Sequence, residues 1–257
     1  SFSSLFGKKT IWETHTGSYN LFARRALKKV DLIVAISGGL KDFYLSKGVS
    51  PSKIIVAHDG VELEDFKISV SRDEVRRTLG LSIDKKIALY AGRLDGWKGI
   101  ETFLEASKMF DDSVGVVIVG GDKNQVSSFS KKYSKVQFLG LKPYKDLPLY
   151  QKAADVLVIP NTSKDIISKL YTSPLKVFSA MASGVPIVAS DLPSIREVLN
   201  EHNSVLVTSD SPQALLMGIM RVLEEATAAD IMAKQALLDV SKYSWTERAK
   251  TIISAIR

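Results

Sequence analysis

The chain has 257 residues, of which 45% are apolar and 25% charged, an ordinary globular composition. It contains no cysteine and only His15, His58 and His202, so disulfide scaffolds, zinc–thiolate sites and thiol nucleophiles are excluded. No apolar run approaches the roughly 20 residues needed to cross a bilayer, and no signal-peptide pattern is present. These features predict a soluble, intracellular protein with one large domain, or one domain and part of another.

The net charge of +7 is concentrated at the N-terminal end. Residues 1–57 carry nine Lys or Arg and three Asp or Glu, a net of +6. Such a basic segment can attract nucleic acid, anionic lipid or phosphorylated small molecules, or it can simply be a solvated helix face. Charge alone leaves these alternatives open.

The first elements are short. We expect a strand at residues 10–13, a basic helix at 21–29, and a strand at 32–36 that leads through a Ser-Gly-Gly turn into another helix. Two strands cannot bury a core alone, so we expect residues 1–66 to be the tail end of a domain, with its hinge. We interpret the charged stretch that continues to residue 77 as part of the same hinge-like connection.

From residue 85 onward, apolar β-rich runs alternate with helical patterns. The pattern predicts strands at residues 87–91, 114–119, 136–139, 156–159, 185–189 and 205–207, and helices at 100–110, 125–133, 147–153, 175–183, 194–199 and 213–225. The strands are apolar on both faces, as in parallel sheets covered by helices on each side. The expected fold is therefore α/β, with a doubly wound parallel sheet at residues 67–240 and a partial second α/β domain at the N-terminus.

The loop at residues 92–99 follows the first of these strands and opens a helix. Its glycines allow close backbone approach to a ligand, and the amide groups at a helix start favour anions. Arg93 adds a planar fork suited to phosphate and Lys98 a compact charge, which together indicate a diphosphate site. A surface turn with two solvated cations is the plainer interpretation.

A second loop, at residues 171–174, leads into the helix predicted at 175–183. Ser173 is a good N-cap and Pro174 suits the first helical position, so the helix start can face the same cleft as Arg93. Taken alone, this segment is more simply a well-capped helix.

In order and spacing, the two loops resemble the donor half of a family 4 (group 1) glycosyltransferase. The match includes Gly-Arg-Leu at 92–94, Lys-Gly at 98–99, Ser-Pro-Leu-Lys at 173–176 and Gly-Val-Pro-Ile-Val-Ala-Ser at 184–190. The resemblance implies the two-domain GT-B fold, transfer of a sugar from a nucleoside-diphosphate sugar with retention of configuration, and no catalytic metal or other cofactor. It also implies that a helix at residues 241–257 packs back towards the N-terminal part.

The resemblance also assigns individual residues. It implies that Arg93 and Lys98 bind the donor diphosphate and that His15 reaches the donor sugar from the opposite domain. The donor-binding set that it implies is Gly92, Gly120, Leu141, Lys142, Tyr171, Ser173, Pro174, Leu175, Lys176 and Ser179.

The chain departs from the family pattern at two places. Position 179 is Ser where many members have a ribose-binding glutamate, which removes a charge and two acceptor oxygens. Position 171 is Tyr where many members have another glutamate, a change common in the Ser-Pro-Leu-Lys branch. The front half of the family's N-terminal domain, which shapes the acceptor pocket, also has no counterpart here.

These departures leave an alternative open: a non-catalytic or split-subunit homologue that needs a partner chain. A sugar-nucleotide epimerase would share the fold but fits the Ser-Pro-Leu-Lys segment less well. No aromatic stacking platform accompanies the basic segment, so nucleic acid is not an expected partner. We expect a cytoplasmic location, with peripheral contact of the basic helix with a membrane left open, and an unidentified glycan or lipid-linked acceptor.

Overall fold

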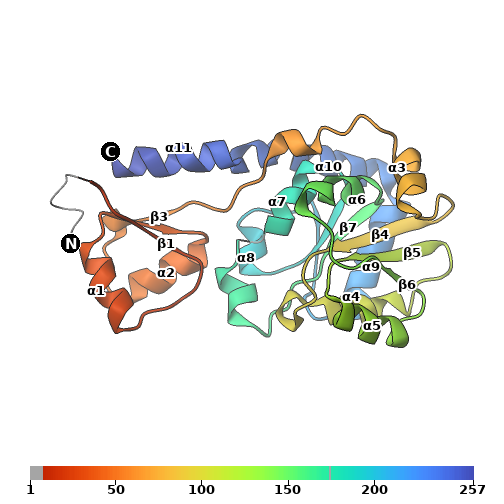
Figure 1. Ribbon diagram of the computed structural model, residues 1–257, viewed down its shortest axis with the longest axis horizontal. Helices are drawn as coiled ribbons and strands as arrows, with labels where there is room; N and C mark the ends of the chain where they lie inside the picture. Colours follow the sequence, from red (N-terminus) through yellow and green to blue (C-terminus); the bar gives the residue numbers. More distant parts are fainter. Residues whose placement is uncertain (1–7, 174) are drawn as a thin grey trace.

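The computed structural model describes residues 8–173 and 175–257 as two lobes of unequal size (Figure 1). The small lobe (residues 8–57) holds three parallel strands in the order β1-β2-β3, with one helix in each connection. These elements are β1 (Ile11–Thr14), α1 (Leu21–Lys29), β2 (Leu32–Ala35), α2 (Gly38–Ser46) and β3 (Ile54–Val56). Residues 51–56 were not predicted as a strand, and β3 gives this lobe the third strand that the sequence pattern lacked.

The large lobe (residues 72–243) contains a six-stranded parallel sheet in the order β6-β5-β4-β7-β8-β9. The strands are β4 (Lys86–Ala91), β5 (Val114–Val119), β6 (Val136–Phe138), β7 (Val156–Ile159), β8 (Ile187–Ser190) and β9 (Val205–Val207). Successive strands add on one side of β4 and then, from β7, on the other. The strand order therefore reverses between β4 and β7, where the loops at the carboxyl ends separate and leave room for a ligand.

Helices cover both faces of this sheet (Figure 1). Ile87 and Leu89 of β4 pack in one core cluster with Phe178, whereas Ala88 and Tyr90 pack in another with Phe103. This alternation explains why the strands are apolar at every position. The helices are α3 (Arg72–Leu79), α4 (Ile100–Ser107), α5 (Lys123–Lys132), α6 (Leu147–Lys152), α7 (Leu175–Ala182), α8 (Pro193–Arg196), α9 (Pro212–Glu224) and α10 (Ala226–Asp239). The doubly wound α/β fold predicted from the sequence is confirmed.

The last helix, α11 (Trp245–Ile256), leaves the large lobe and runs along the small one (Figure 1). Its Ile252 and Ile256 pack against Leu32, Val34 and Ala57. The two chain crossings between the lobes lie together, because Val61 and Ser244 form a parallel bridge.

The hinge predicted to extend to residue 77 is shorter than expected, because α3 occupies Arg72–Leu79. This helix is anchored by Arg76, a buried cation whose Nε donates to the carbonyl of Ala153 over 2.8 Å and whose Nη2 lies 2.6 Å from an Asp155 oxygen. The helix therefore buries Arg76 beside the apolar Val75, and a buried arginine adds nothing to an apolar periodicity. Within the described ranges, no helix is both long and apolar enough to cross a membrane.

Candidate functional site

A cavity of about 650 Å³ lies between the lobes, at the carboxyl ends of the strands. The small lobe contributes His15 and Thr16 from the loop after β1 and Ile36 from the end of β2, and the connecting segment contributes Asp59. The large lobe contributes the loops after β4, β5, β6 and β7 and the start of α7. The cavity therefore lies at the reversal of strand order, where the topology of the sheet places a ligand.

The loop after β4 forms the base of one wall. Gly99 has φ +72°, and a Cβ there would lie 1.8 Å from the carbonyl oxygen of Pro160, so only glycine fits. This close approach holds the short turn at Gly96–Lys98 against the loop after β7. Arg93 lies at the rim, largely exposed, with its Nε 2.9 Å from Asp95 Oδ2.

Lys98 reaches inward from the same turn, and its Nζ lies 3.5 Å from the centre of the Trp97 ring. Burial lowers the pKa of Lys98 to about 8; nearby Asp95 opposes this effect and Arg93 adds to it. A protonated lysine in such a place lacks most of the solvation that normally stabilises its charge.

Lys176, in the first turn of α7, is the most deeply buried cation of the site. Its Nζ lies 5.1 Å from the centre of the Tyr90 ring, and no described residue accepts a hydrogen bond from it. Burial, reinforced by the charge of Lys98, lowers the pKa of Lys176 well below its usual range. We call Arg93, Lys98 and Lys176 the cationic wall. An unpaired buried cation is costly, and an anion bound in the cavity would remove that cost.

The start of α7 lies beside this wall. Ser173 and Leu175 line the cavity, and the Ser173 Oγ accepts a hydrogen bond from the amide of Asp59 over 2.9 Å. The amide ends of helices favour anions, so the helix start and the cationic wall favour the same kind of ligand. Pro174, predicted as part of this group, lies outside the described residues.

The loops after β5 and β6 form the far end of the cavity, where Gly120, Leu141 and Lys142 line it together with Gly92. A Cβ at Gly120 would lie 1.9 Å from the carbonyl oxygen of Gly92, so these loops touch through their backbones. Lys142 is the charged residue of this group, and its Nζ lies 5.9 Å from the centre of the Tyr150 ring.

Ser179 also lines the cavity, but its hydroxyl already forms hydrogen bonds within the protein. The Oγ accepts a hydrogen bond from Gln151 Nε2 and donates one to the carbonyl of Lys176, both over 3.1 Å. The Oε1 of Gln151 is buried and has no partner among the described residues. Gln151 was not singled out from the sequence, since its proximity to Ser179 depends on how α6 packs on α7.

Tyr171 is the one described residue of the predicted set that does not line the cavity. It lies at the end of a single π-helical turn, Ile167–Tyr171, and its ring packs edge-on against Phe43 of α2, with ring centres 5.8 Å apart. Its carbonyl oxygen accepts a hydrogen bond from the Ser37 hydroxyl over 3.0 Å. Tyr171 therefore joins the lobes beside the cavity.

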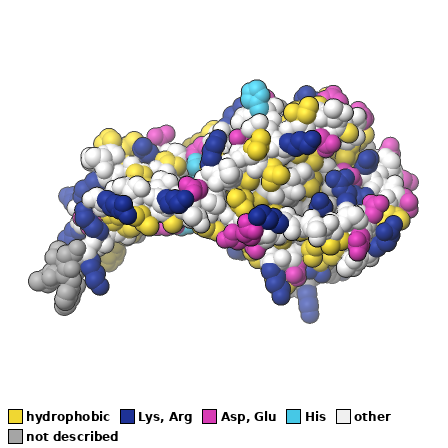
Figure 2. Space-filling view, turned by 90° about the horizontal axis from the view of Figure 1, so that it is seen from above, with side chains coloured by type: hydrophobic (Ala, Val, Ile, Leu, Met, Phe, Trp, Pro, Cys, Tyr) yellow, Lys and Arg dark blue, Asp and Glu magenta, His cyan; other side chains and the backbone are white. Residues whose placement is uncertain are grey.

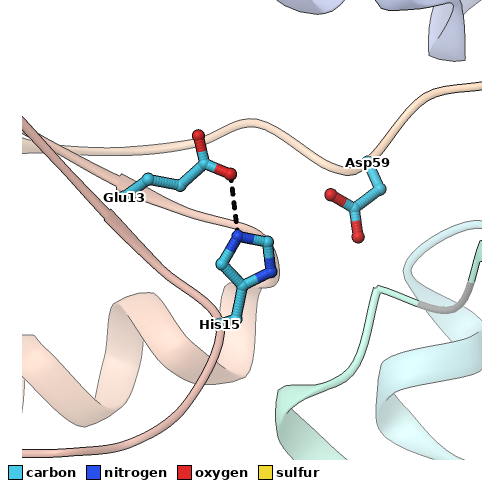
Figure 3. A group of neighbouring side chains, drawn as sticks. All are labelled: Glu13, His15 and Asp59. Carbon is cyan, nitrogen blue, oxygen red and sulfur yellow. Dashed lines mark hydrogen bonds and ion pairs between the residues drawn. The ribbon is translucent and has the colours of Figure 1, made fainter.

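The opposite wall of the cavity belongs to the small lobe and the connecting segment. We call Glu13, His15 and Asp59 the carboxylate wall; His15 and Asp59 line the cavity and Glu13 lies behind His15 (Figure 3). His15 Nε2 lies 2.8 Å from Glu13 Oε1, and a Glu13 oxygen lies 3.0 Å from Arg248 of α11. Of this wall only His15 was expected from the sequence, because Asp59 was interpreted as part of the hinge.

Comparison with known proteins identifies the family of the chain. The family described as "Glycosyl transferases group 1" matches residues 71–238. The uncharacterized glycosyltransferase MJ1607 of Methanocaldococcus jannaschii is 28% identical over 238 residues, covering 88% of this chain and 59% of the relative. TuaC of Bacillus subtilis, a glycosyltransferase named for teichuronic acid biosynthesis, is 30% identical over 210 residues, covering 81% of this chain and 51% of TuaC. The chain thus spans between 51% and 59% of the length of these relatives.

Among solved structures, Anabaena HepE in complex with UDP and glucose superimposes with a TM-score of 0.83 at 20% identity, covering 99% of this chain and 73% of HepE. This likeness extends over both lobes and confirms the predicted GT-B architecture. The family match covers the sheet and helices that build the cationic wall. The chain therefore belongs to the glycosyl transferases group 1 family, as its loop motifs predicted.

Proposed function

We propose that this chain binds a nucleoside-diphosphate sugar in the cavity and forms the donor side of a glycosyltransferase. The observation that carries the proposal is the cationic wall, where half-buried Lys98 has no hydrogen-bonded acid and the buried ammonium group of Lys176 has no acceptor among the described residues. A diphosphate supplies the missing negative charge. The cavity volume of about 650 Å³ suits a ligand of nucleotide size.

In the proposed reaction, the bond between the sugar and the diphosphate breaks and negative charge grows on the leaving phosphate oxygen. Lys98 and Lys176 would stabilise that charge from inside the cavity. Arg93 would leave its contact with Asp95 at the rim and bind the same oxygen atoms. These side chains would do what a bound metal ion does elsewhere, so we expect transfer to proceed in a chelator. Retention of configuration, expected from the family, is tested by the anomeric form of the first product.

The remaining donor contacts follow from position in the cavity. We assign the far end, with Leu141, Lys142 and the glycine backbones, to the nucleobase. Ser173, Leu175 and the helix start lie between the cationic wall and Asp59, where we place the terminal phosphate and the sugar. HepE, the structural relative, has been solved with UDP-glucose, which makes UDP a first ligand to test.

The decisive experiment is calorimetric titration of the chain with UDP, GDP, ADP and CDP. We expect one diphosphate to bind, and Arg93→Ala to weaken it about tenfold or more through loss of a charge-assisted contact. Arg77→Ala is the matched control, because Arg77 is an exposed arginine on α3 that does not line the cavity. Failure of all four diphosphates to bind the parent would overturn the proposal.

The acceptor is outside this assignment, because the chain spans only part of its relatives. A partner chain or further sequence would have to complete the acceptor side. Sugar transfer, or hydrolysis of the donor, by this chain alone would exclude the alternative of a non-catalytic or split subunit.

We further propose peripheral contact with an anionic membrane through α1. Figure 2 shows Lys and Arg side chains gathered on the small lobe. On α1 the charged residues Arg24, Arg25, Lys28 and Lys29 are exposed, and Phe22 is 82% exposed. An exposed aromatic residue beside basic residues suits a lipid headgroup region. Cosedimentation with phosphatidylglycerol vesicles, lost in Phe22→Ser and absent with phosphatidylcholine, would support this contact.

A further inference from the structure

The two walls of the cavity have opposite chemistry. The cationic wall offers positive charge, whereas the carboxylate wall offers hydrogen-bond acceptors (Figure 3). A ligand that spans the cavity therefore needs an anionic end and, within a few ångströms, a group that donates hydrogen bonds. Sugar hydroxyls next to a diphosphate meet this requirement.

Asp59 is the central group of the carboxylate wall. It is 9% exposed and lines the cavity, and its carboxylate accepts no hydrogen bond from any described residue. Its backbone amide is fixed by the hydrogen bond to Ser173 Oγ, so the carboxylate is held beside the start of α7. Burial raises the pKa of Asp59, and His15, Arg248 and His58 each act to lower it. The Asp59 oxygens therefore face the cavity without a protein donor and are free to accept hydrogen bonds from a ligand.

His15 completes the arrangement. One ring nitrogen of His15 and one carboxylate oxygen each from Glu13 and Asp59 lie within 4.8 Å of one another. Nε2 of His15 faces the Glu13 carboxylate, which leaves the other ring nitrogen for a ligand. In Figure 3 the Asp59 carboxylate points towards the His15 ring, and no direct hydrogen bond joins these two within the described residues.

The carboxylate wall is a poor place for a metal ion. Arg248 lies 3.0 Å from the Glu13 oxygen that also contacts His15, and its Nε donates to the carbonyl of His58 over 2.9 Å. A guanidinium in this position repels a cation and already balances the charge of Glu13. Glu13 thus orients His15, which leaves Asp59 as the acid that faces the ligand.

We propose that Asp59 makes the site prefer the sugar-bearing nucleotide over the free diphosphate, because its carboxylate accepts hydrogen bonds from hydroxyl groups of the sugar. The contact of His15 with that sugar is what the family resemblance already implies. This inference rests on the proposed function. A free diphosphate exposes a terminal phosphate with about one additional negative charge at neutral pH, which an ionised Asp59 repels. The sugar removes that charge and supplies hydroxyl donors, so one carboxylate favours the substrate and disfavours the product.

The test is a comparison of two ligands in the same variants. Whichever of UDP, GDP, ADP and CDP binds the parent is titrated at neutral pH in EDTA, together with its glucose conjugate. In Asp59→Asn, the free diphosphate should bind about threefold to tenfold more tightly and the conjugate about tenfold more weakly. The ratio of the two dissociation constants then changes by about thirtyfold or more.

Asn keeps the size of the side chain and the backbone hydrogen bond to Ser173, so folding should be unchanged. Asp42→Asn, on the exposed face of α2, is the matched control and should leave the ratio unchanged. His15→Gln should weaken the conjugate but not tighten the free diphosphate, because it removes no negative charge. A ratio that moves less than about threefold in Asp59→Asn overturns the inference, whereas failure of the parent to bind any diphosphate overturns the proposed function.

Discussion

The two walls of the cavity differ in how their charges are balanced. On the carboxylate wall, Glu13 is paired with Arg248 and with His15, and the contacts cross from the small lobe to α11. On the cationic wall, Lys176 has no acceptor among the described residues and Lys98 contacts only an aromatic ring closely. The difference indicates that Glu13 and His15 form a preformed part of the carboxylate wall, whereas the two lysines of the cationic wall have no acid to offset their charge when protonated.

The largest effect is expected from Lys176→Met, which removes the buried ammonium group that has no acceptor. The variant should lose affinity for the diphosphate by about 100-fold or more, because a buried charged contact is worth about 2–5 kcal/mol. The unliganded protein should become more stable by about 1–3 kcal/mol, since a buried cation is replaced by an apolar side chain of similar length. Calorimetry gives the affinity and thermal melting the stability. A melting temperature below that of the parent would contradict the view that Lys176 is held at a cost.

The pH dependence of diphosphate binding tests the role of Lys98 in the cationic wall. With a pKa of about 8, Lys98 is protonated at neutral pH and largely neutral one unit above that value. Affinity for the diphosphate should therefore fall about tenfold between about pH 7 and about pH 9. Titration at both pH values tests this, and Lys98→Arg should show a shallower fall because arginine keeps its charge. Equal slopes in the two proteins would assign the pH dependence to another group.

The stability of the unliganded protein should depend on pH in the opposite direction to diphosphate binding. The folded-state pKa of Lys98 lies below the 10.5 of an unperturbed lysine. Between these values the unfolded chain binds more protons than the folded one, so the contribution of Lys98 to stability rises with pH across that window. Binding should weaken and the free protein should gain stability over the same range.

The Ser179→Glu variant tests whether a carboxylate of the protein itself can be placed beside the cationic wall. The new carboxylate would lie in the first turns of α7, close to Gln151 and to the unpaired Lys176. We expect nucleotide affinity to rise about fivefold through a charge-assisted bond to the ribose, less the cost of burial. The gain should disappear with the 2′,3′-dideoxy diphosphate. An equal gain with both ligands would mean that the glutamate acts on Lys176 rather than on the ribose.

The smallest effect is expected from Arg248→Gln, which breaks the support of the carboxylate wall. Glu13 would lose its guanidinium partner and His58 its donor, for a loss of about 1–2 kcal/mol in the free energy of unfolding. Denaturant unfolding measures this loss, with Lys250→Gln on the exposed face of α11 as control. Affinity for the free diphosphate should change less than about threefold. A large loss of that affinity would show that the two walls are not independent.

The sheet of the large lobe was well predicted because each strand is itself a run of apolar residues. β5, β7 and β9 begin and end where the apolar runs do, and both faces of β5 and β7 are largely buried. β8 begins at Ile187, two residues later than expected, where Pro186 offers no amide to the ladder. β3 was missed, and α3 was interpreted as part of the hinge, because the buried Arg76 beside Val75 adds no apolar signal. Local patterns cannot report contacts such as that between Arg76 and Asp155.

The same limit applies to the cavity. Lys98, Ser173 and Lys176 could be placed there because glycines and a helix start mark their loops, although their roles stay predictions. Asp59 and Gln151 could not, because each gains its significance from a side chain far away in the sequence. Asp59 faces His15 only because the first lobe folds back, and Gln151 reaches Ser179 only because α6 packs beside α7.

The pairing of Val61 with Ser244 also limits how the lobes can move. The Val61 amide donates to the carbonyl of Tyr243 over 3.0 Å, and the chain therefore crosses between lobes twice along one line. A Cβ at Gly60 would lie 2.8 Å from the amide nitrogen of Trp245, so the two crossings are in close contact. Sliding of one lobe past the other would break this pairing, whereas rotation about it would not. Rotation about the pairing would leave Asp59, two residues before Val61, nearly fixed while His15 moves relative to the cationic wall, and it would have to break the hydrogen bonds of Ser37 and Gly38 with the large lobe.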